Sequence, residues 1–440
     1  MSYLIKPLVV LAVAASSLLL KLPSDVHAGL FIFLLVGGLW LTDSFHLTIT
    51  ALLVPALAAL TGLMTVSEAA SHFASPVIVL FFGGFALAAA LRRQGLDSWL
   101  AHGLIRLARG EPRLTLLMLF LSTVLLGLWI SNTATAAIML PLALGLLHDW
   151  QADKRLCTFT LLGVAWSATI GGMVTLIGSP PNAIAASALG WGFREWLAVG
   201  APVFALLYPL ALAVLWLGLR PPLPSQLTLT TMPSRMDWTP AHLKTLGIFL
   251  FTVLLWIWGH IPAQWLGISA DKDALAALLA VILLAVFRCV SWDDLNKGTQ
   301  WGVLLLFGGG IALSAVLQTS GTSSWLATLL HGILPTDNLL LSMLIITTFV
   351  VFFSEFISNT ACTALLVPVM IPIAAQIGLP KEAMVPLIAL ASSTAFMLPV
   401  ATPANALVYG TGHISAADMR RAGFRMNLLA IPVLVWWFVV

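Results

Sequence analysis

Two short polar motifs interrupt apolar sequence at matching places, and they constrain the fold more than any other feature of this chain. The residues Ser-Asn-Thr-Ala at 131–134 are followed by Pro141, and they recur at 358–361, 227 positions later, followed by Pro368. Hydroxyl and amide side chains compete for backbone hydrogen bonds, and an unsatisfied backbone group in hydrocarbon costs several kcal/mol. Breaks of this kind are tolerated only where protein or a water-filled cavity surrounds them. A matched pair therefore predicts a binding site between two halves, as in transporters.

The composition places the chain in a membrane. Hydrophobic residues make up 60% of the 440 positions, charged residues make up 8%, and the mean hydropathy is +1.03. We therefore predict an all-α polytopic membrane protein. The net charge of +3 is too small to imply a nucleic-acid partner, and Cys157, Cys289 and Cys362 lack the spacing of disulfide or zinc pairs. We expect the apolar run 8–20 to be a first membrane helix, because no convincing signal-peptide cleavage site follows it.

The apolar runs predict about eleven transmembrane helices and two re-entrant hairpins. The hairpins are 113–148 and 337–376, around the two motifs, because only three polar residues join their arms. Full crossings by all four arms remain an alternative, since arms of this length can span. Short interfacial helices are expected at 96–109 and 322–333. The expected spans are 6–20, 28–42, 46–64, 75–91, 156–190 (broken at 178–182), 198–219, 244–264, 273–288, 300–318, 383–409 (broken at 401–405) and 426–440.

Internal repetition predicts the domain organisation. Besides the two motifs, Phe82-Gly83-Gly84 matches Phe307 and Gly309-Gly310, and the residues at 179–182 match those at 402–405, with offsets of 223 to 227. We expect a first inverted repeat at 75–219 and a second at 300–440. The remaining segments are expected to be N-terminal scaffold helices at 1–74, a proline-rich cytoplasmic linker at 220–243 and further scaffold helices at 244–299.

Lysine and arginine set the expected orientation. With a cytoplasmic N-terminus, 16 of the 20 lie on the cytoplasmic side, and only Lys21, Arg194, Lys272 and Lys381 lie outside. The first hairpin then enters from inside and the second from outside, since residues 298–380 contain neither lysine nor arginine. This arrangement predicts inverted repeats in the plasma (inner) membrane, with the C-terminus on the outer side.

The polar groups at membrane depth indicate what the site binds. Helix N-termini at each break present free N–H groups that suit an anion. Freed carbonyls and side-chain oxygens suit sodium. Because no basic side chain lies there, co-bound cations would neutralise an anionic substrate, and no other cofactor is expected. Glu355 is the only acidic residue at this depth, and the sequence leaves open whether its role is functional or structural; its counterpart in the first repeat is Leu128.

With these motifs the chain resembles the divalent anion:sodium symporter family, which includes dicarboxylate, citrate and sulfate carriers. The resemblance covers nearly the whole chain and also rests on Thr-Leu-Ile-Gly-Ser-Pro-Pro-Asn at 175–182 and Ala-Phe-Met-Leu-Pro-Val-Ala-Thr-Pro at 395–403. It implies a homodimer in lipid, in which each protomer has a scaffold domain and a transport domain that moves like an elevator.

The resemblance also implies roles for individual residues. One sodium site would use Ser131, Asn132 and the carbonyl near Gly178. The other would use Ser354, Asn359 and the carbonyls near Ile357 and Ala401. The chain departs from the family at Gly127, where relatives often carry a serine that helps to hold sodium, and at Ala404, which replaces a second proline. The implied substrate contacts are Asn132, Thr133, Ser179, Pro180, Ser358, Asn359, Thr360, Thr402 and Pro403.

These observations predict a secondary active transporter that imports a small dianion, with a C4-dicarboxylate such as succinate as substrate and sodium as the driving ion. A sodium-independent dicarboxylate exchanger and a sulfate or tricarboxylate carrier remain alternatives. An anion channel is a remote alternative, because no ring-forming charged residues are present. An enzyme is not expected, because the breaks lack paired acids, a His–Glu metal motif and Ser–His or Ser–Lys pairs.

Overall fold

The chain is helical throughout its described length, which confirms the predicted all-α class. A computed structural model describes residues 5–224, 237–267, 270–332, 334–335 and 338–439, and these residues include no strand. The first half contains α1 (Ile5–Ser16), η2 (Ser17–Leu19), α2 (Ser24–Leu41), α3 (Leu47–Leu60), α4 (Val66–Ser71), η3 (His72–Ala74), α5 (Pro76–Arg93), α6 (Leu96–Leu107), α7 (Pro112–Gly127), α8 (Asn132–Asp149), α9 (Lys154–Gly172), α10 (Pro180–Leu189) and α11 (Phe193–Leu219).

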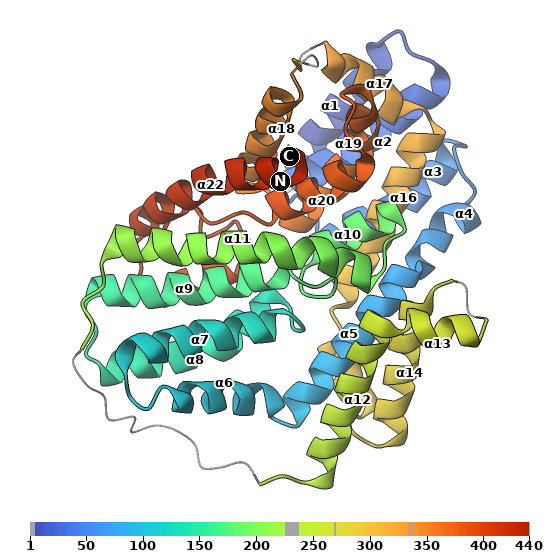
Figure 1. Ribbon diagram of the computed structural model, residues 1–440. Helices are drawn as coiled ribbons and strands as arrows, with labels where there is room; N and C mark the ends of the chain where they lie inside the picture. Colours follow the sequence, from blue (N-terminus) through green and yellow to red (C-terminus); the bar gives the residue numbers. More distant parts are fainter. Residues whose placement is uncertain (1–4, 225–236, 268–269, 333, 336–337, 440) are drawn as a thin grey trace.

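The second half of the chain runs from α12 to α22, yellow-green to red in Figure 1. Its helices are α12 (Pro240–Trp258), α13 (His260–Trp265), α14 (Lys272–Val286), α15 (Trp292–Gly298), α16 (Trp301–Thr319), α17 (Thr322–His331), α18 (Leu339–Phe353), α19 (Asn359–Gln376), α20 (Lys381–Ser392), α21 (Pro403–Gly410) and α22 (Ala416–Val439).

Several helices are long and apolar enough to cross a membrane. By length and composition, seven stretches of the described chain qualify, and α1, α3, α7 and α18 are shorter apolar helices. Large apolar side chains such as Leu60 and Leu217 are exposed at 83% and 68%, as expected for surfaces covered by lipid. The chain is therefore a polytopic membrane protein, and the total of eleven spans remains a prediction. The seven stretches are Ser24–Leu41, Val66–Arg93, Phe193–Leu219, Pro240–Trp258, Trp301–Thr319, Asn359–Gln376 and Ala416–Val439.

The internal repeat extends over more helices than the expected boundaries at 75 and 300. Helices α5 to α11 correspond in order to α16 to α22, and their first residues differ by 223 to 227 positions. The order also continues outward, because α3 and α4 correspond to α14 and α15 with offsets of 225 and 226. Helices α4 and α15 each begin with a capping box, formed by Thr65 with Glu68 and by Ser291 with Asp294.

Glycines allow equivalent helix pairs to approach closely in the two halves. A Cβ added at Gly83 of α5 would lie 2.5 Å from the Ala277 Cβ of α14. A Cβ added at Gly309 of α16 would lie 2.6 Å from the Ala51 Cβ of α3. The two pairs are related by the same offset of 226. Small residues at helix contacts are the usual packing device in membranes, where burial of apolar area supplies little driving force.

The two halves meet at a pair of equivalent aromatic rings. Phe81 of α5 and Phe307 of α16 are buried, and their ring centroids lie 4.9 Å apart in an edge-to-face arrangement. The two residues differ by 226 positions, so each ring contacts its own counterpart. Such a self-contact places the pseudo-two-fold axis that relates the halves between these rings.

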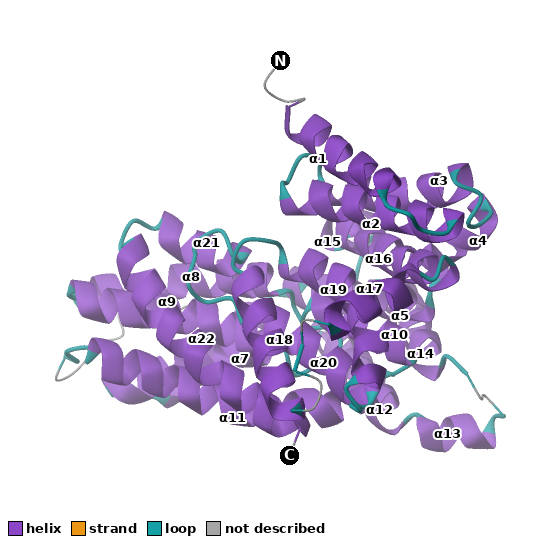
Figure 2. Cartoon of the chain, turned by 90° about the horizontal axis from the view of Figure 1, so that it is seen from above, coloured by secondary structure: helices purple, strands orange, loops and turns teal. Residues whose placement is uncertain are grey.

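The second segment of each broken helix packs on the opposite repeat. Helix α10 contacts α19 and α20, and α21 contacts α8 and α9. Figure 2 shows α21 beside α8 and α9, far from the α10 region. The arms of the expected hairpins differ, because α7 and α8 pack on each other, whereas α18 packs mainly on α22 and α20, and α19 on α17 and α20. The predicted start of the second hairpin, residue 337, lies outside the described residues.

The breaks are longer than the sequence suggested. Helix α9 ends at Gly172, so residues 173–179 are unwound, although the break was expected only at 178–182. Helix α20 ends at Ser392, so residues 393–402 are unwound, although the break was expected at 401–405. These apolar residues read as helix, but side chains described below bind the backbone groups that unwinding leaves unpaired.

Two other helices begin earlier in the chain than expected. Helix α22 begins at Ala416 and not at 426, because Asp418, Arg420 and Arg421 interrupt the apolar run without interrupting the helix. Helix α12 begins at Pro240, inside the segment 220–243 that was expected to be a linker. Thr239 caps this helix and accepts a bond from the His242 backbone. The central part of the linker, 225–236, lies outside the described residues.

Candidate functional site

The end of α7 and the start of α8 lie against the unwound segment of the first repeat. A Cβ added at Gly172 would lie 2.3 Å from Asn132 Oδ1 and 2.9 Å from the Gly178 carbonyl oxygen. A Cβ added at Gly178 would lie 2.6 Å from the Gly172 carbonyl oxygen and 2.8 Å from that of Gly127. No side chain fits at these separations, so glycine at both positions allows four oxygen atoms to gather at this point.

The side-chain oxygens of Asn132 and Asn359 are buried without a hydrogen-bond donor in the described structure. The two residues are counterparts, and each is the first residue of the helix that follows its motif, α8 or α19. An unsatisfied buried polar atom costs roughly 1–3 kcal/mol. Other buried oxygens, including Oδ1 of the equivalent pair Asn182 and Asn405, are also unpaired. At Asn132 and Asn359 the unpaired oxygen lies in an expected cation site, and a hard cation such as sodium binds oxygens of this kind.

Ser131, also expected to bind sodium, differs from the two asparagines because its side-chain oxygen has hydrogen-bond partners in the protein. It is half-buried, and its Oγ accepts hydrogen bonds from the Ala134 backbone N–H at 3.5 Å and from Gln300 Nε2 at 2.8 Å. Asn132 Oδ1 and the Gly178 carbonyl oxygen both lie close to Gly172, whereas the Ser131 hydroxyl has a protein partner. Ligation of a cation by these groups remains a prediction. Gln300 was not among the predicted site residues.

The residues expected at the second sodium site lie in the equivalent region. Ser354 is fully buried, and its hydroxyl donates to the Val351 carbonyl at 2.9 Å, which leaves its lone pairs available. Ile357 and Ala401 are buried, and Asn359 is half-buried. Ligation of a cation by these four residues remains a prediction.

Glu355 has a structural, hydrogen-bonded role. It is 1% exposed and binds the unwound segment of the second repeat through both carboxylate oxygens. The backbone N–H groups of Phe396, Met397 and Leu398 donate to it at 2.8, 2.9 and 3.0 Å, and Asn427 Nδ2 donates at 2.7 Å. The carboxylate therefore replaces the backbone acceptors that these three residues lose where α20 ends.

Different atoms hold the first repeat together at the equivalent place. Thr175 Oγ1 donates to the Leu128 carbonyl and accepts from the Gly178 backbone N–H at 3.1 Å. Leu128 is the counterpart of Glu355, so each residue connects the end of α7 or α18 to the unwound segment of the same repeat. One half uses a hydroxyl and a carbonyl, and the other uses a carboxylate.

Asn182 and Asn405 hold the two breaks open, a role that the sequence analysis missed. Asn182 Nδ2 donates to two carbonyl oxygens at 2.9 and 2.7 Å, and Asn405 Nδ2 donates to the equivalent two at 3.2 and 3.1 Å. The available signal was the recurrence of an asparagine two residues after a proline. The accepting residues are Gly172 and Thr175 in the first repeat and Ala395 and Leu398 in the second.

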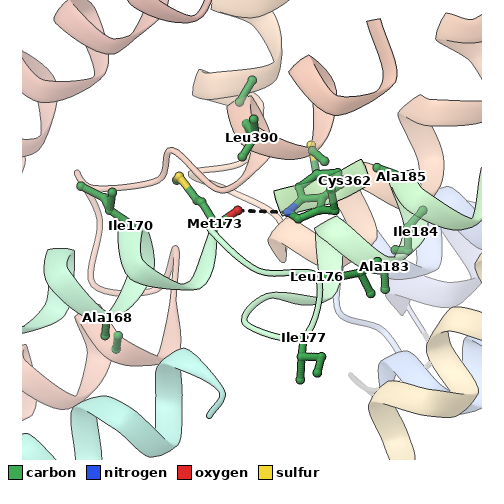
Figure 3. Close-up of a cluster of buried hydrophobic side chains, with 14 of the residues drawn as sticks. Ala168, Ile170, Met173, Leu176, Ile177, Ala183, Ile184, Ala185, Cys362 and Leu390 are labelled. Atoms are coloured by element: carbon green, nitrogen blue, oxygen red, sulfur yellow. Dashed lines mark hydrogen bonds between the residues drawn. The ribbon is translucent and has the colours of Figure 1, made fainter. Parts of the chain in front are cut away.

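Helices α11 and α22 support the breaks from behind. A Cβ added at Gly200 of α11 would lie 2.5 Å from the Met173 carbonyl oxygen, and one at Gly423 of α22 would lie 2.2 Å from that of Phe396. Figure 3 shows the chain leaving α9 at Met173, whose carbonyl accepts a bond from Trp196 Nε1 at 3.1 Å. The two glycines differ by 223 positions, so the support is repeated.

All nine predicted substrate residues lie at the N-termini of α8, α10, α19 and α21. Thr402 Oγ1 caps α21 by accepting from the Asn405 backbone N–H at 3.1 Å, whereas Ser179 and Ser358 make no side-chain cap bond. The hydroxyls of these two serines can therefore bind a ligand. Thr133 and Pro403 are exposed, Asn132, Pro180, Ser358 and Asn359 are half-buried, and Ser179, Thr360 and Thr402 are buried.

The chemistry of this region is that of neutral oxygens and backbone N–H groups. In the described part of the chain, no three His, Cys, Asp or Glu side chains gather as metal ligands. A cavity of about 420 Å³ lies elsewhere, between α7, α9 and α11, and its lining is apolar except for Arg113. The unpaired oxygens and N–H groups that could bind a ligand lie at the breaks and not in this cavity.

Comparison with known proteins decides the family. The family model described as citrate transporter matches residues 38–378 and 340–440. The chain belongs to the citrate transporter family. A protein of Haemophilus influenzae named as an uncharacterized transporter is 43% identical over 417 residues, which cover 93% of this chain and 90% of that protein. This member of the citrate transporter family is therefore a multi-pass membrane transporter and not an enzyme.

Other relatives of this citrate transporter family member carry names that specify a substrate and an ion. The sodium-dependent dicarboxylate transporter SdcS of Staphylococcus saprophyticus is 31% identical over 464 residues, covering 95% of this chain and 87% of that protein. It confirms the expected resemblance to divalent anion:sodium symporters. In fold, the chain is similar to the crystal structure of the Alcanivorax borkumensis YdaH transporter, with a TM-score of 0.51 and 16% identity, covering 83% of this chain and 86% of that one.

Proposed function

We propose that the protein is a secondary active transporter that couples sodium entry to the uptake of a C4-dicarboxylate such as succinate. The observation that carries the proposal is the pair of buried, unpaired Oδ1 atoms of Asn132 and Asn359 at equivalent positions. The printed name of the SdcS relatives, sodium-dependent dicarboxylate transporter, supports both the ion and the substrate class.

The order of binding follows from the charges at the site. The four helix N-termini carry partial positive charge that favours a carboxylate, but none of the nine proposed substrate contacts is lysine or arginine. Two carboxylates in this partly buried place need further positive charge. Sodium ions at Asn132 and Asn359 supply that charge, so they bind first and raise the affinity for the dianion.

Transport is proposed to occur by an elevator movement in a homodimer in the inner membrane, with a cytoplasmic N-terminus. Helices α7 to α11 and α18 to α22 form the moving transport domain, and α2 to α5 and α12 to α16 form the scaffold. The glycine contacts of α5 with α14 and of α16 with α3 support a rigid scaffold. The crossed contacts of α10 and α21 support a transport domain that moves as one unit.

A dicarboxylate exchanger is the second candidate, and Gly127 favours it. The counterpart of Gly127 in the second repeat is Ser354, so the first cation site lacks one hydroxyl that the second has. A weaker first site reduces the dependence of transport on sodium. Exchange of internal for external dicarboxylate then needs no net sodium movement.

The test is uptake of radiolabelled succinate into proteoliposomes. Three conditions are compared: an inward sodium gradient, an equal potassium gradient, and internal succinate without sodium. We expect accumulation only with external sodium. Accumulation that requires internal succinate and ignores sodium would establish the exchanger, and no succinate uptake under any condition would exclude this substrate.

Restoring a hydroxyl at Gly127 should strengthen the dependence on sodium. A Cβ at this position would lie 3.1 Å from the Ala168 carbonyl oxygen, so both serine and alanine crowd the contact between α7 and α9. Only serine adds an oxygen that can bind the cation. We therefore expect Gly127→Ser to need less sodium for half-maximal uptake than Gly127→Ala, measured in the same proteoliposomes.

Comparing Gly127→Ser with Gly127→Ala distinguishes the effect of the hydroxyl from the effect of steric crowding. Equal sodium requirements for the two variants would show that the serine oxygen does not reach the cation. Equal loss of uptake in both would show that the close approach of α7 and α9 matters more than ligation.

A further inference from the structure

Gln300 connects the scaffold to the first cation site. It precedes the first residue of α16, and its Nε2 donates to Ser131 Oγ, which precedes α8, at 2.8 Å. The two residues are 169 positions apart. Of the residues proposed to bind sodium, Ser131 is thus held by a side chain from outside the transport domain.

Neighbouring contacts fix the backbone around Gln300. The Thr299 backbone N–H donates to the Leu295 carbonyl at 2.9 Å, which ends α15. The Trp301 ring lies against the Phe82 ring of α5, with centroids 5.8 Å apart. Gln300 is therefore held by rigid scaffold elements, while its exposed side chain extends to the transport domain.

The bond uses the electron pair that a cation would need. A hydroxyl oxygen has two lone pairs. At Ser131 one is directed to the Ala134 N–H at 3.5 Å, which is a weak bond, and the other accepts from Gln300. Sodium ligation by this oxygen therefore requires that the Gln300 bond be released.

Among the described residues, no hydrogen bond links Ser75 and Ser358, the counterparts of Gln300 and Ser131 in the other repeat. The residue that precedes α5, in the place of Gln300, is Ser75, which makes no side-chain cap bond and is too short to extend as glutamine does. Ser358, the counterpart of Ser131, also makes no side-chain cap bond. When inverted repeats exchange their positions during transport, the first cation site alone meets a competing amide.

We propose that Gln300 is a positioning residue that displaces sodium from Ser131 and so promotes cation release on one side of the membrane. The inference rests on the proposed sodium coupling. Release takes place where the first turn of α16 lies, which is the cytoplasmic side in the expected orientation. The bond forms as sodium leaves, so it stabilises the arrangement in which Ser131 holds no cation.

The decisive variant is Gln300→Ala, tested for the sodium dependence of succinate uptake. Removing the competitor should lower the sodium concentration for half-maximal uptake by roughly two- to tenfold, the effect of one hydrogen bond. Ser131→Ala loses the same bond but also a sodium ligand, so it should raise that concentration. Gln300→Asn keeps a donor and should shift sodium dependence less than Gln300→Ala. The matched control is Gln318→Ala, an exposed glutamine on α16 that bonds only Ser314, and it should not change sodium dependence.

A second measurement separates this inference from the proposed function. In the double variant Gln300→Cys/Ser131→Cys, a short bis-methanethiosulfonate reagent should cross-link the two positions in membranes. The native cysteines are buried and should not compete. Absence of a cross-link would refute the contact whether or not transport uses sodium. If a cross-link forms and the native protein uses sodium, an unchanged sodium requirement in Gln300→Ala would refute the competition. If the native protein ignores sodium, the proposed coupling is wrong and the competition is refuted with it.

Discussion

Alanine at Asn132 or at Asn359 is expected to reduce succinate uptake by roughly tenfold to a hundredfold, the range for losing a bond to a charged group. Each Oδ1 is buried without a protein donor, so its removal leaves no other group unpaired in the described structure. The variants should therefore fold and lose function. Uptake in proteoliposomes gives the rate, and size-exclusion chromatography in detergent reports whether the protein stays folded.

A matched control is Asn338→Ala, at the exposed start of α18, where the side chain only caps the helix by accepting from Leu341 N–H at 3.0 Å. Its uptake should stay near normal. If Asn132→Ala and Asn359→Ala also transport normally, the cation sites do not lie at these asparagines. If only one of the two variants fails, one site carries the coupling, and the first repeat with Gly127 is expected to be the weaker.

Glu355→Ala is expected to damage the fold as well as transport. The carboxylate accepts three backbone N–H groups and the Asn427 amide, and each buried donor left unsatisfied costs roughly 1–3 kcal/mol. The unwound segment 393–402 would lose its attachment to the end of α18. We expect a lower melting temperature in detergent and almost no uptake. Glu355→Gln should recover only part, because its amide presents N–H groups to donors.

The control for this variant is Glu382→Ala, an exposed acid in the first turn of α20. It should retain melting temperature and uptake. If Glu355→Ala has the same melting temperature as Glu382→Ala but does not transport, Glu355 acts on the substrate or the ion directly. If Glu355→Ala keeps both the melting temperature and the uptake of Glu382→Ala, the hydrogen bonds contribute little.

Apolar runs and repeated motifs were sufficient to predict the helix interruptions and the internal repeat. The two Ser-Asn-Thr motifs predicted interruptions between apolar runs that resume at 134 and 361. In the structure the helices are interrupted there, between α7 and α8 and between α18 and α19, and the following helices begin two residues earlier than expected. The repeat was visible for the same reason, since duplicated helices retain similar lengths and polar breaks.

Interactions between distant residues could not be predicted in this way. Nothing local distinguishes Gln300 from other exposed glutamines, because its partner is 169 positions away. The role of Glu355 depends on three N–H groups that are free only because α20 ends at Ser392, and the apolar residues that follow read as helix. The charged start of α22 was missed because hydropathy identifies segments that can lie in lipid, and a helix can begin outside such a segment.

The crossing of α10 and α21 has a consequence for biosynthesis. Helix α10 emerges from the ribosome early, but its partners α19 and α20 end about 200 residues later in the chain. At roughly 5–20 residues per second, translation of that interval takes on the order of 10 to 40 s. During this time a short segment with buried polar groups lacks its two main partners, although α5 is already present. The first half must therefore wait in the insertion machinery or in lipid, and the protein matures only when synthesis is nearly complete.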